Sequence, residues 1–212
     1  MLRTCAAYLL LAFAIACQGQ YEPTKAISPG EVPSASSPEL LSRTRPLMST
    51  VFRIQVDAAP DNAENVIRDA FQEIERLETV LSEWREGSDI SKVNSLAGKK
   101  SVKVSEDTLR VVDAGVDVSM WSRGAFDLSW AALWGLYDFR PDSIQIPSVD
   151  EITPRLRLID YKNIRVSKKY KTVFLKKRGM AIGTGGIAKG YALDQAGAIL
   201  RGGGVENYMI FG

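Results

Sequence analysis

The stretch from Asp61 to Trp84 restricts the possible folds of this chain more than any other part of its sequence. Its apolar residues recur three or four positions apart, which predicts a long helix with one buried face. Asp61 is the expected N-cap, with Glu64 three residues later as in a capping box. Such a helix must bury its apolar face, so the rest of the chain must supply a sheet or further helices.

Segments typical of strands and of further helices alternate around this helix. Residues 47–56 are rich in β-branched and aromatic residues and predict one strand. The alternation predicts the α/β class, in the form of a mixed α+β sandwich. The other expected strands are 102–104, 164–166, 172–175, 180–182 and 208–211, and the other expected helices are 89–97, 105–121, 150–159 and about 185–200.

The chain has 212 residues and contains no histidine. This excludes a Ser-His-Asp or Cys-His triad, a His-ligated zinc site and an imidazole proton shuttle within it. Any chemistry must use carboxylates, lysine, hydroxyls, backbone groups or a hard metal ion. The net charge is only +2, with 27 Lys and Arg interspersed among 25 Asp and Glu. We therefore expect no nucleic-acid partner.

Residues 1–16 have the features of a lipoprotein signal peptide. Arg3 precedes an apolar run, 6–16, that is too short to anchor the chain across a bilayer. The run ends in AIAC at residues 14–17, which resembles a bacterial lipobox cut before a cysteine that then receives a lipid. An ordinary secretory signal cut near the same place is the alternative. We expect a chain anchored through Cys17 in the bacterial cell envelope, facing the periplasm or the outside.

Residues 17–46 are rich in Ser, Pro and small residues, with SPGEVPSASSP at their centre. They have few apolar residues to bury, so we expect a flexible tether. The folded part then covers residues 47–212. Because the sequence stops within an expected strand, which would be an unprotected edge, we interpret 47–212 as the N-terminal part of a larger, here incomplete, domain.

The segment GTGGIAKG, residues 183–190, follows an expected strand and opens an expected helix. Its glycines let backbone N–H groups approach an anion, and Lys189 adds a positive charge, as in a phosphate cradle. It is not a P-loop, because Ala188 and Gly190 flank the lysine where Gly and Ser or Thr are required. It matches a GxGxxA dinucleotide fingerprint only formally, since Glu206 precedes the next strand. A Gly-rich turn with a solvated lysine is the alternative.

Two other polar segments each allow two interpretations. Asp127, in GAFDLS at residues 124–129, is either the N-cap of the following segment or a group that binds a ligand's hydroxyls or amides. The polar residues of LSEW and SDISKVN, at 81–84 and 88–94, cap a short helix by default. The neighbouring tryptophans are more often core than ligand platform. Taken singly, none of these segments identifies a function.

Together, and in this order, the segments resemble the FAD:protein FMN transferases, also called the ApbE or flavin-trafficking lipoprotein family. The matching pieces lie between residues 48 and 194 and read MST, LSEWREGSDISKVN, GAFDLSWAALWGLYDF and GGIAKGYALD. The resemblance implies an enzyme that binds FAD with Mg²⁺, breaks the pyrophosphate, transfers FMN to a threonine of a target protein and releases AMP. Some members hydrolyse FAD to FMN and AMP instead.

The same resemblance implies site residues but no catalytic residue. The flavin contacts would be Met48, Ala125, Phe126, Asp127 and Lys189. The backbone carbonyl of Gly186 would be a ligand of Mg²⁺, which prefers hard oxygen donors. In the family, the side-chain ligands of the metal and a histidine lie in a part that would follow residue 212.

One position departs from the family pattern. The family usually has an acidic residue six positions before the lysine, where this chain has Gly183, with Thr184 beside it as a possible substitute. This departure motivates a second hypothesis, an FAD-binding lipoprotein without catalysis. A third, a dinucleotide-dependent oxidoreductase, is motivated by GxGxxA alone.

Overall fold

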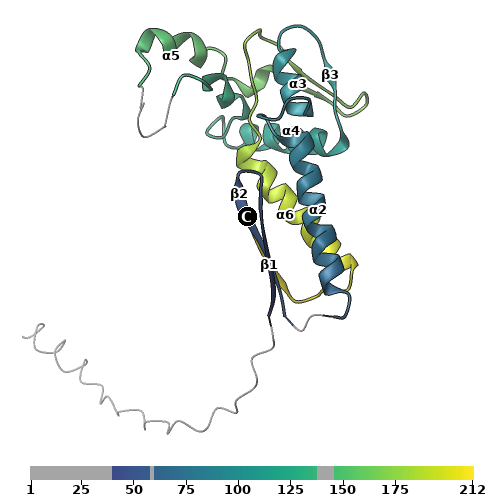
Figure 1. The fold of residues 1–212 in the computed structure, drawn as a ribbon. Helices are drawn as coiled ribbons and strands as arrows, with labels where there is room; N and C mark the ends of the chain where they lie inside the picture. Colours follow the sequence, from purple (N-terminus) through teal and green to yellow (C-terminus); the bar gives the residue numbers. More distant parts are fainter. Residues whose placement is uncertain (1–39, 58–59, 138–145) are drawn as a thin grey trace, which may run out of the picture. The chain divides into compact units, whose positions relative to one another are not determined.

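The computed structural model describes residues 40–57, 60–137 and 146–212. The expected signal peptide and Cys17 lie outside the described residues, as does most of the expected tether. Within the described ranges, the chain forms two three-stranded antiparallel sheets with helices packed on them (Figure 1). The predicted mixed α/β architecture is therefore confirmed.

The first sheet has the strand order β1-β2-β6, from β1 (Leu41–Leu47), β2 (Thr50–Val56) and β6 (Tyr208–Phe211). Residues 41–46, which we expected in the tether, instead pair with β2 along its whole length. The expected single strand 47–56 is accordingly split by a two-residue turn. Apolar content alone does not reveal β1, because its outward residues are Ser, Thr and Arg and its stability comes from pairing with β2.

Helices α2 (Ala63–Leu81) and α6 (Gly185–Gly202) lie side by side against this sheet, as Figure 1 shows. The predicted apolar face of α2 is buried, and it shares a core with β2 and α6. The predicted cap is wrong: Asn62 is the N-cap without a side-chain bond, and Glu64 pairs with Arg43 of β1 instead of folding back. The helix also ends at Leu81, before Trp84, because Ser82 is extended.

The second sheet has the order β3-β5-β4, from β3 (Val102–Lys103), β5 (Thr172–Leu175) and β4 (Ile164–Ser167). Its inner face shares a second core with α3 (Asp89–Ser95), α4 (Glu106–Trp121) and the 3-10 helix η1 (Leu128–Leu133). Two further short helices, α5 (Val149–Leu156) and η2 (Tyr161–Asn163), precede β4. Residues 180–182, an expected strand, are extended but join neither sheet.

A hydrogen-bonded cluster joins three helices across the boundary between the two cores. Asp107 of α4 accepts hydrogen bonds from Tyr191 of α6, at 2.7 Å, and from Arg76 of α2, at 2.8 Å. Burial opposes ionisation of Asp107, but these two bonds outweigh it and hold the pKa of the carboxyl below its usual range. Burial, together with the bond to Asp107, raises the pKa of the Tyr191 hydroxyl.

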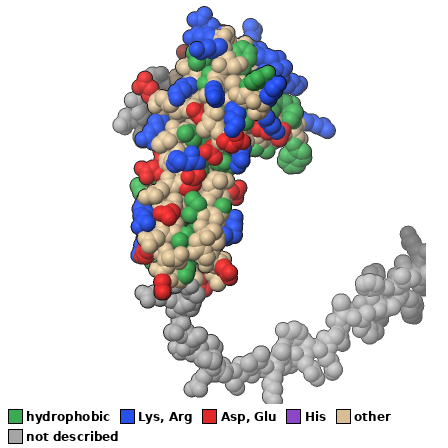
Figure 2. Space-filling model, turned by 90° about the vertical axis from the view of Figure 1, so that its right-hand side faces the viewer, with side chains coloured by type: hydrophobic (Ala, Val, Ile, Leu, Met, Phe, Trp, Pro, Cys, Tyr) green, Lys and Arg blue, Asp and Glu red, His purple; other side chains and the backbone are tan. Residues whose placement is uncertain are grey.

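Positive side chains gather over the second sheet, in the upper part of Figure 2, although cations and acids are mixed along the sequence. Two of them pair with acids of α4, Lys168 with Asp113 at 2.7 Å and Lys171 with Glu106 at 2.8 Å. The exposed cations of the sheet and its adjoining loops are Lys99, Lys100, Lys103, Arg165, Lys168, Lys169, Lys171, Lys176, Lys177 and Arg178.

Candidate functional site

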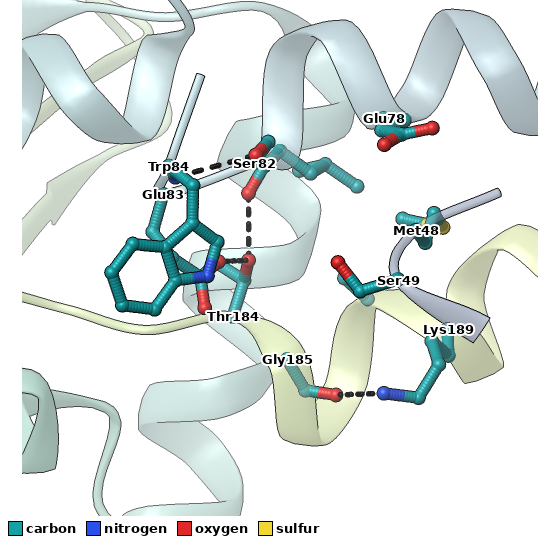
Figure 3. A pocket seen from close by; sticks show the side chains of 11 residues that line it. Met48, Ser49, Glu78, Ser82, Glu83, Trp84, Thr184, Gly185 and Lys189 are labelled. Carbon is teal, nitrogen blue, oxygen red and sulfur yellow. Dashed lines mark hydrogen bonds between the residues drawn. The ribbon is translucent and has the colours of Figure 1, made fainter. Parts of the chain in front are cut away.

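A pocket of about 180 Å³ lies where the β1–β2 turn, the C-terminal end of α2 and the N-terminal end of α6 meet (Figure 3). Two residues predicted to contact flavin, Met48 and Lys189, both line it although they are far apart in the sequence. Eleven residues line the pocket: Met48, Ser49, Glu78, Leu81, Ser82, Glu83, Trp84, Thr184, Gly185, Ala188 and Lys189.

The β1–β2 turn reaches the pocket through an unusual backbone. Met48 and Ser49 both have positive φ, 49° and 59°. Two consecutive left-handed residues suit the twist of a two-residue hairpin, but the turn normally uses Asn and Gly there. Strain of this kind is tolerated where the surrounding structure enforces it, and it is common at functional sites. Here the turn places the Met48 side chain against both the first core and the pocket.

The Gly-rich turn begins α6 without a side-chain cap. Thr184 occupies the N-cap position, but its hydroxyl donates away from the helix, to the carbonyl of Leu81 at 2.8 Å. Within the described part of the chain, the N–H groups of Gly185 and Gly186 have no hydrogen-bond acceptor. The helix therefore presents open N–H groups and the positive end of its dipole, as an anion site requires.

Lys189 adds a formal charge at the same place. It is half-buried, and its Nζ donates to the carbonyl of Gly185 at 3.2 Å, one turn earlier in α6 (Figure 3). The ammonium group is thereby held beside the open start of the helix. An anionic ligand in this pocket would meet both the charge and the N–H groups.

Of the predicted residues 125–127, Phe126 lies against the Gly-rich turn. The Phe126 ring adjoins Gly186, since a Cβ built on Gly186 would be 3.1 Å from Phe126 Cε2. Ala125 is exposed and, like Phe126 and Gly186, does not line the pocket. Of the predicted site residues, Met48 and Lys189 thus share the pocket, and Phe126 lies against Gly186.

Asp127 faces the protein. Its Oδ1 accepts from the N–H of Ser129 at 2.8 Å and from its hydroxyl at 2.6 Å, and its Oδ2 accepts from the N–H of Tyr161 at 2.8 Å. The N-cap interpretation of Asp127 is therefore confirmed. A flavin contact by this residue stays a prediction.

The described residues do not supply a complete set of ligands for a metal ion. The carbonyl of Gly185 and the carboxylates of Glu78 and Glu83, which line the pocket, are hard oxygen ligands of the kind Mg²⁺ prefers. However, no three His, Cys, Asp or Glu side chains gather into a metal-binding group within the described ranges. These residues alone do not fit a magnesium site, so we assign no catalytic step to a metal here.

Sequence reasoning missed Glu83 and Trp84 as site residues, because the periodicity placed Trp84 on the buried face of the long helix. In the structure Trp84 is 70% exposed, and its ring centroid lies 4.6 Å from that of Trp134, which also contacts Trp130 edge-on. Trp84 thus lines the pocket and belongs to a cluster of three tryptophans. The run of charged residues and glycine right after Trp84 is the signal that it follows the helix rather than belonging to it.

Trp130 and Trp134 also explain the glycine at position 183. A Cβ built there would be 2.9 Å from Trp134 Cζ2 and 3.3 Å from Trp130 Cε2. Since Gly183 is buried against these rings, an acidic side chain does not fit. Thr184 does not replace the missing acidic residue, because its hydroxyl donates to the carbonyl of Leu81 and is not free to contact a ligand.

Comparison with known proteins gives a consistent result. Residues 48–211 match the model of the ApbE family. The chain is 31% identical over 140 residues to the FAD:protein FMN transferase of Klebsiella pneumoniae (66% of this chain, 44% of the relative). It is 26% identical over 171 residues to that of Vibrio cholerae (78% and 50%). The chain spans about half the length of the curated relatives it matches.

Solved structures agree in fold. The ApbE protein of Thermotoga maritima superposes with a TM-score of 0.70 at 30% identity, covering 77% of this chain and 53% of that protein. The flavin transferase ApbE of Vibrio cholerae gives a TM-score of 0.74 at 23% identity, covering 82% and 57%.

Proposed function

This chain belongs to the ApbE family, and on that basis we propose that it carries the flavin-nucleotide site of an enzyme that transfers FMN from FAD to a protein. The observation that carries the proposal is the pocket at the start of α6. There an apolar side chain, Met48, and an exposed ring, Trp84, lie beside the open N–H groups and Lys189. An FAD molecule needs both surfaces, because it joins planar rings to a doubly charged pyrophosphate.

The chain's own residues supply binding and charge neutralisation in this proposal. Phosphoryl transfer depends mainly on positioning and on stabilising the negative charge of the phosphates. Lys189 and the first N–H groups of α6 would hold the pyrophosphate, while Met48 and Trp84 would hold an aromatic ring. The acceptor threonine, the release of AMP and the requirement for Mg²⁺, with the Gly186 carbonyl as one ligand, are finer parts of the same proposal.

The test uses the full-length protein with FAD, Mg²⁺ and an acceptor protein that bears a threonine. We expect covalent flavin fluorescence on the acceptor in a denaturing gel and an equal amount of AMP by chromatography. EDTA should abolish both signals, and Lys189→Ala should lower them at least tenfold, since an ion pair with phosphate is lost. Absence of both covalent flavin and AMP, with FAD bound, would contradict the transferase proposal.

The same experiment separates the two alternatives. AMP with free FMN but no covalent flavin would identify a hydrolase of the FAD pyrophosphate. Bound FAD without AMP would identify a flavin-binding lipoprotein without catalysis, which the glycine at position 183 favours.

We also propose that the protein is attached to the bacterial cell envelope by a lipid on Cys17, facing the periplasm or the outside. The lipobox-like AIAC motif supports this. In the described part of the chain, no helix has both the length and the apolar character needed to cross a membrane. After detergent phase separation, we expect the mature wild-type protein in the detergent phase and the Cys17→Ala variant in the aqueous phase. Equal partitioning of the two proteins would contradict a lipid anchor.

A further inference from the structure

The carboxylate of Glu83 is half-buried in the pocket, and its Oε1 accepts no hydrogen bond from the described residues. Its Oε2 accepts from the hydroxyl of Thr184 at 3.2 Å, and it shares this donor with the Leu81 carbonyl, which lies closer, at 2.8 Å (Figure 3). The N–H groups that follow Glu83 do not reach it either, because both donate to Ser82 Oγ. Within the described residues Glu83 has no ion pair. A half-buried carboxylate in this state favours a donor from outside.

The position of the Glu83 carboxylate indicates which part of a ligand it would contact. Glu83 Oε1 lies 3.7 Å from the point that a Cβ on Gly185 would occupy, so it stands at the very start of α6. Two residues earlier, Gly183 has no side chain and is packed against Trp134. The loop after α2 therefore places the carboxylate of Glu83 beside the Gly-rich turn, which has no acidic side chain of its own.

Charges of both signs thus line one pocket, since Lys189 is positive and the carboxylates of Glu83 and Glu78 are negative. Lys189 favours a phosphate, whereas a carboxylate repels one and accepts hydrogen bonds from hydroxyl or amino groups. A ligand that carries phosphate next to a polyol or an amino group would satisfy both ends in one orientation only. This matches a dinucleotide, in which hydroxyl-bearing ribityl and ribose chains flank the pyrophosphate.

We propose that Glu83 is a substrate-recognition residue that accepts a hydrogen bond from a hydroxyl or amino group of the bound flavin nucleotide, next to the phosphates held at Lys189. The inference rests on the proposed function for the identity of the ligand. It makes Glu83 the residue that orients the nucleotide along the pocket, while Lys189 and the helix N-terminus supply the attraction.

The test compares the affinity of the full-length wild type, Glu83→Gln and Glu83→Ala for FAD, FMN and ADP. We expect Glu83→Gln and Glu83→Ala to weaken FAD binding about tenfold to a hundredfold, the range of a charge-assisted hydrogen bond. The affinity for one of the two smaller ligands, FMN or ADP, should fall as well. A fall for FMN assigns the donor to the ribityl half of FAD, and a fall for ADP assigns it to the adenosine half. Glu86→Gln, an exposed neighbour outside the pocket, is the matched control and should bind as the wild type does.

Each outcome decides the matter. Wild-type affinity for FAD in both Glu83 variants would overturn this inference and leave the proposed function standing. Failure of the wild type itself to bind FAD would overturn both. A loss for FAD, FMN and ADP alike, with a lower unfolding temperature, would assign Glu83 a structural role through Thr184 and would also overturn the inference.

Discussion

Ser49 and Met48 share a strained backbone, but their side chains differ in what they contact. Each left-handed residue costs about 1 kcal/mol relative to glycine at the same angles. Ser49→Gly removes that strain, and the greater freedom of glycine in the unfolded chain offsets part of the gain.

We therefore expect Ser49→Gly to raise the free energy of unfolding by up to about 1 kcal/mol in urea titrations. Met48→Gly gains the same relief but loses a side chain packed on the first core, so it should be less stable than the wild type. The interpretation of strain is wrong if Ser49→Gly is the more destabilised of the two.

Gly183 and Gly190 form a matched pair, because only one of them has neighbours where a side chain would be. A Cβ on Gly183 meets Trp134 at 2.9 Å, whereas nothing lies within 4 Å of a Cβ on Gly190, inside α6. Gly183→Ala should lower the free energy of unfolding by about 1–3 kcal/mol through overpacking. Gly190→Ala should raise it by about 0.5–1 kcal/mol, because alanine favours helix.

Thermal and urea unfolding measure both changes, and tryptophan fluorescence should shift only in Gly183→Ala. Equal stability of the two variants would show that Trp134 moves aside freely, and the glycine at position 183 would then need another explanation.

Asn94 ties two elements that are far apart in the sequence. Its side chain, from α3, donates to the carbonyl of Ile182 at 3.0 Å and accepts from the N–H of Ile182 at 2.8 Å. The extended segment before the Gly-rich turn is thus held like a strand without belonging to a sheet. This explains how residues 180–182, an expected strand, are extended without joining a sheet.

Asn94→Ala should lower the free energy of unfolding by about 2–4 kcal/mol, because it leaves two buried backbone groups of Ile182 without partners. Amide hydrogen exchange at Ile182 should accelerate with it. Asn65→Ala is the control, because Asn65 is exposed on α2 and its side chain accepts a hydrogen bond from exposed Arg68; it should change stability by less than about 0.5 kcal/mol. Unchanged exchange at Ile182 would contradict the role of Asn94.

The cluster of Arg76, Asp107 and Tyr191 acts at the scale of the whole molecule, since it links helices of both cores. The pKa of Asp107 is lower in the folded state than in the unfolded chain. Its stabilising contribution is therefore complete above the ordinary carboxyl pKa of about 4 and is lost as the pH falls through the lower folded value.

Asp107→Asn should lower the free energy of unfolding at pH 7 by about 1 kcal/mol, a modest value because Arg76 is half-exposed. It should also flatten the loss of stability below pH 4, since asparagine does not titrate there. Urea unfolding at pH 7, 4 and 3 measures both effects. Glu75→Gln, an exposed acid on α2, should leave the acid slope unchanged, and an equal slope in Asp107→Asn would contradict the linkage.

Much of the fold was predictable because its signals are local. The helices α2, α4 and α6 were predicted from apolar spacing and from the Gly-rich turn before α6, and Ser105, expected as the first residue of α4, is its N-cap. The cap of α2 was wrong because Glu64 found a distant partner, Arg43. In the site, Met48 and Lys189 were predicted from a resemblance and do share a pocket, but Glu83 and Trp84 were not predicted.

The sequence by itself determined the elements with a regular period, the Gly-rich turn and the types of residue available for chemistry, because propensity and spacing act between near neighbours. Only the tertiary structure decided that residues 41–47 pair with β2, that Asp127 faces the protein, and that cations gather over the second sheet. It also decided that the loop after α2 brings Glu83 to the start of α6. These features depend on contacts between residues far apart in the chain, and no local pattern encodes such contacts.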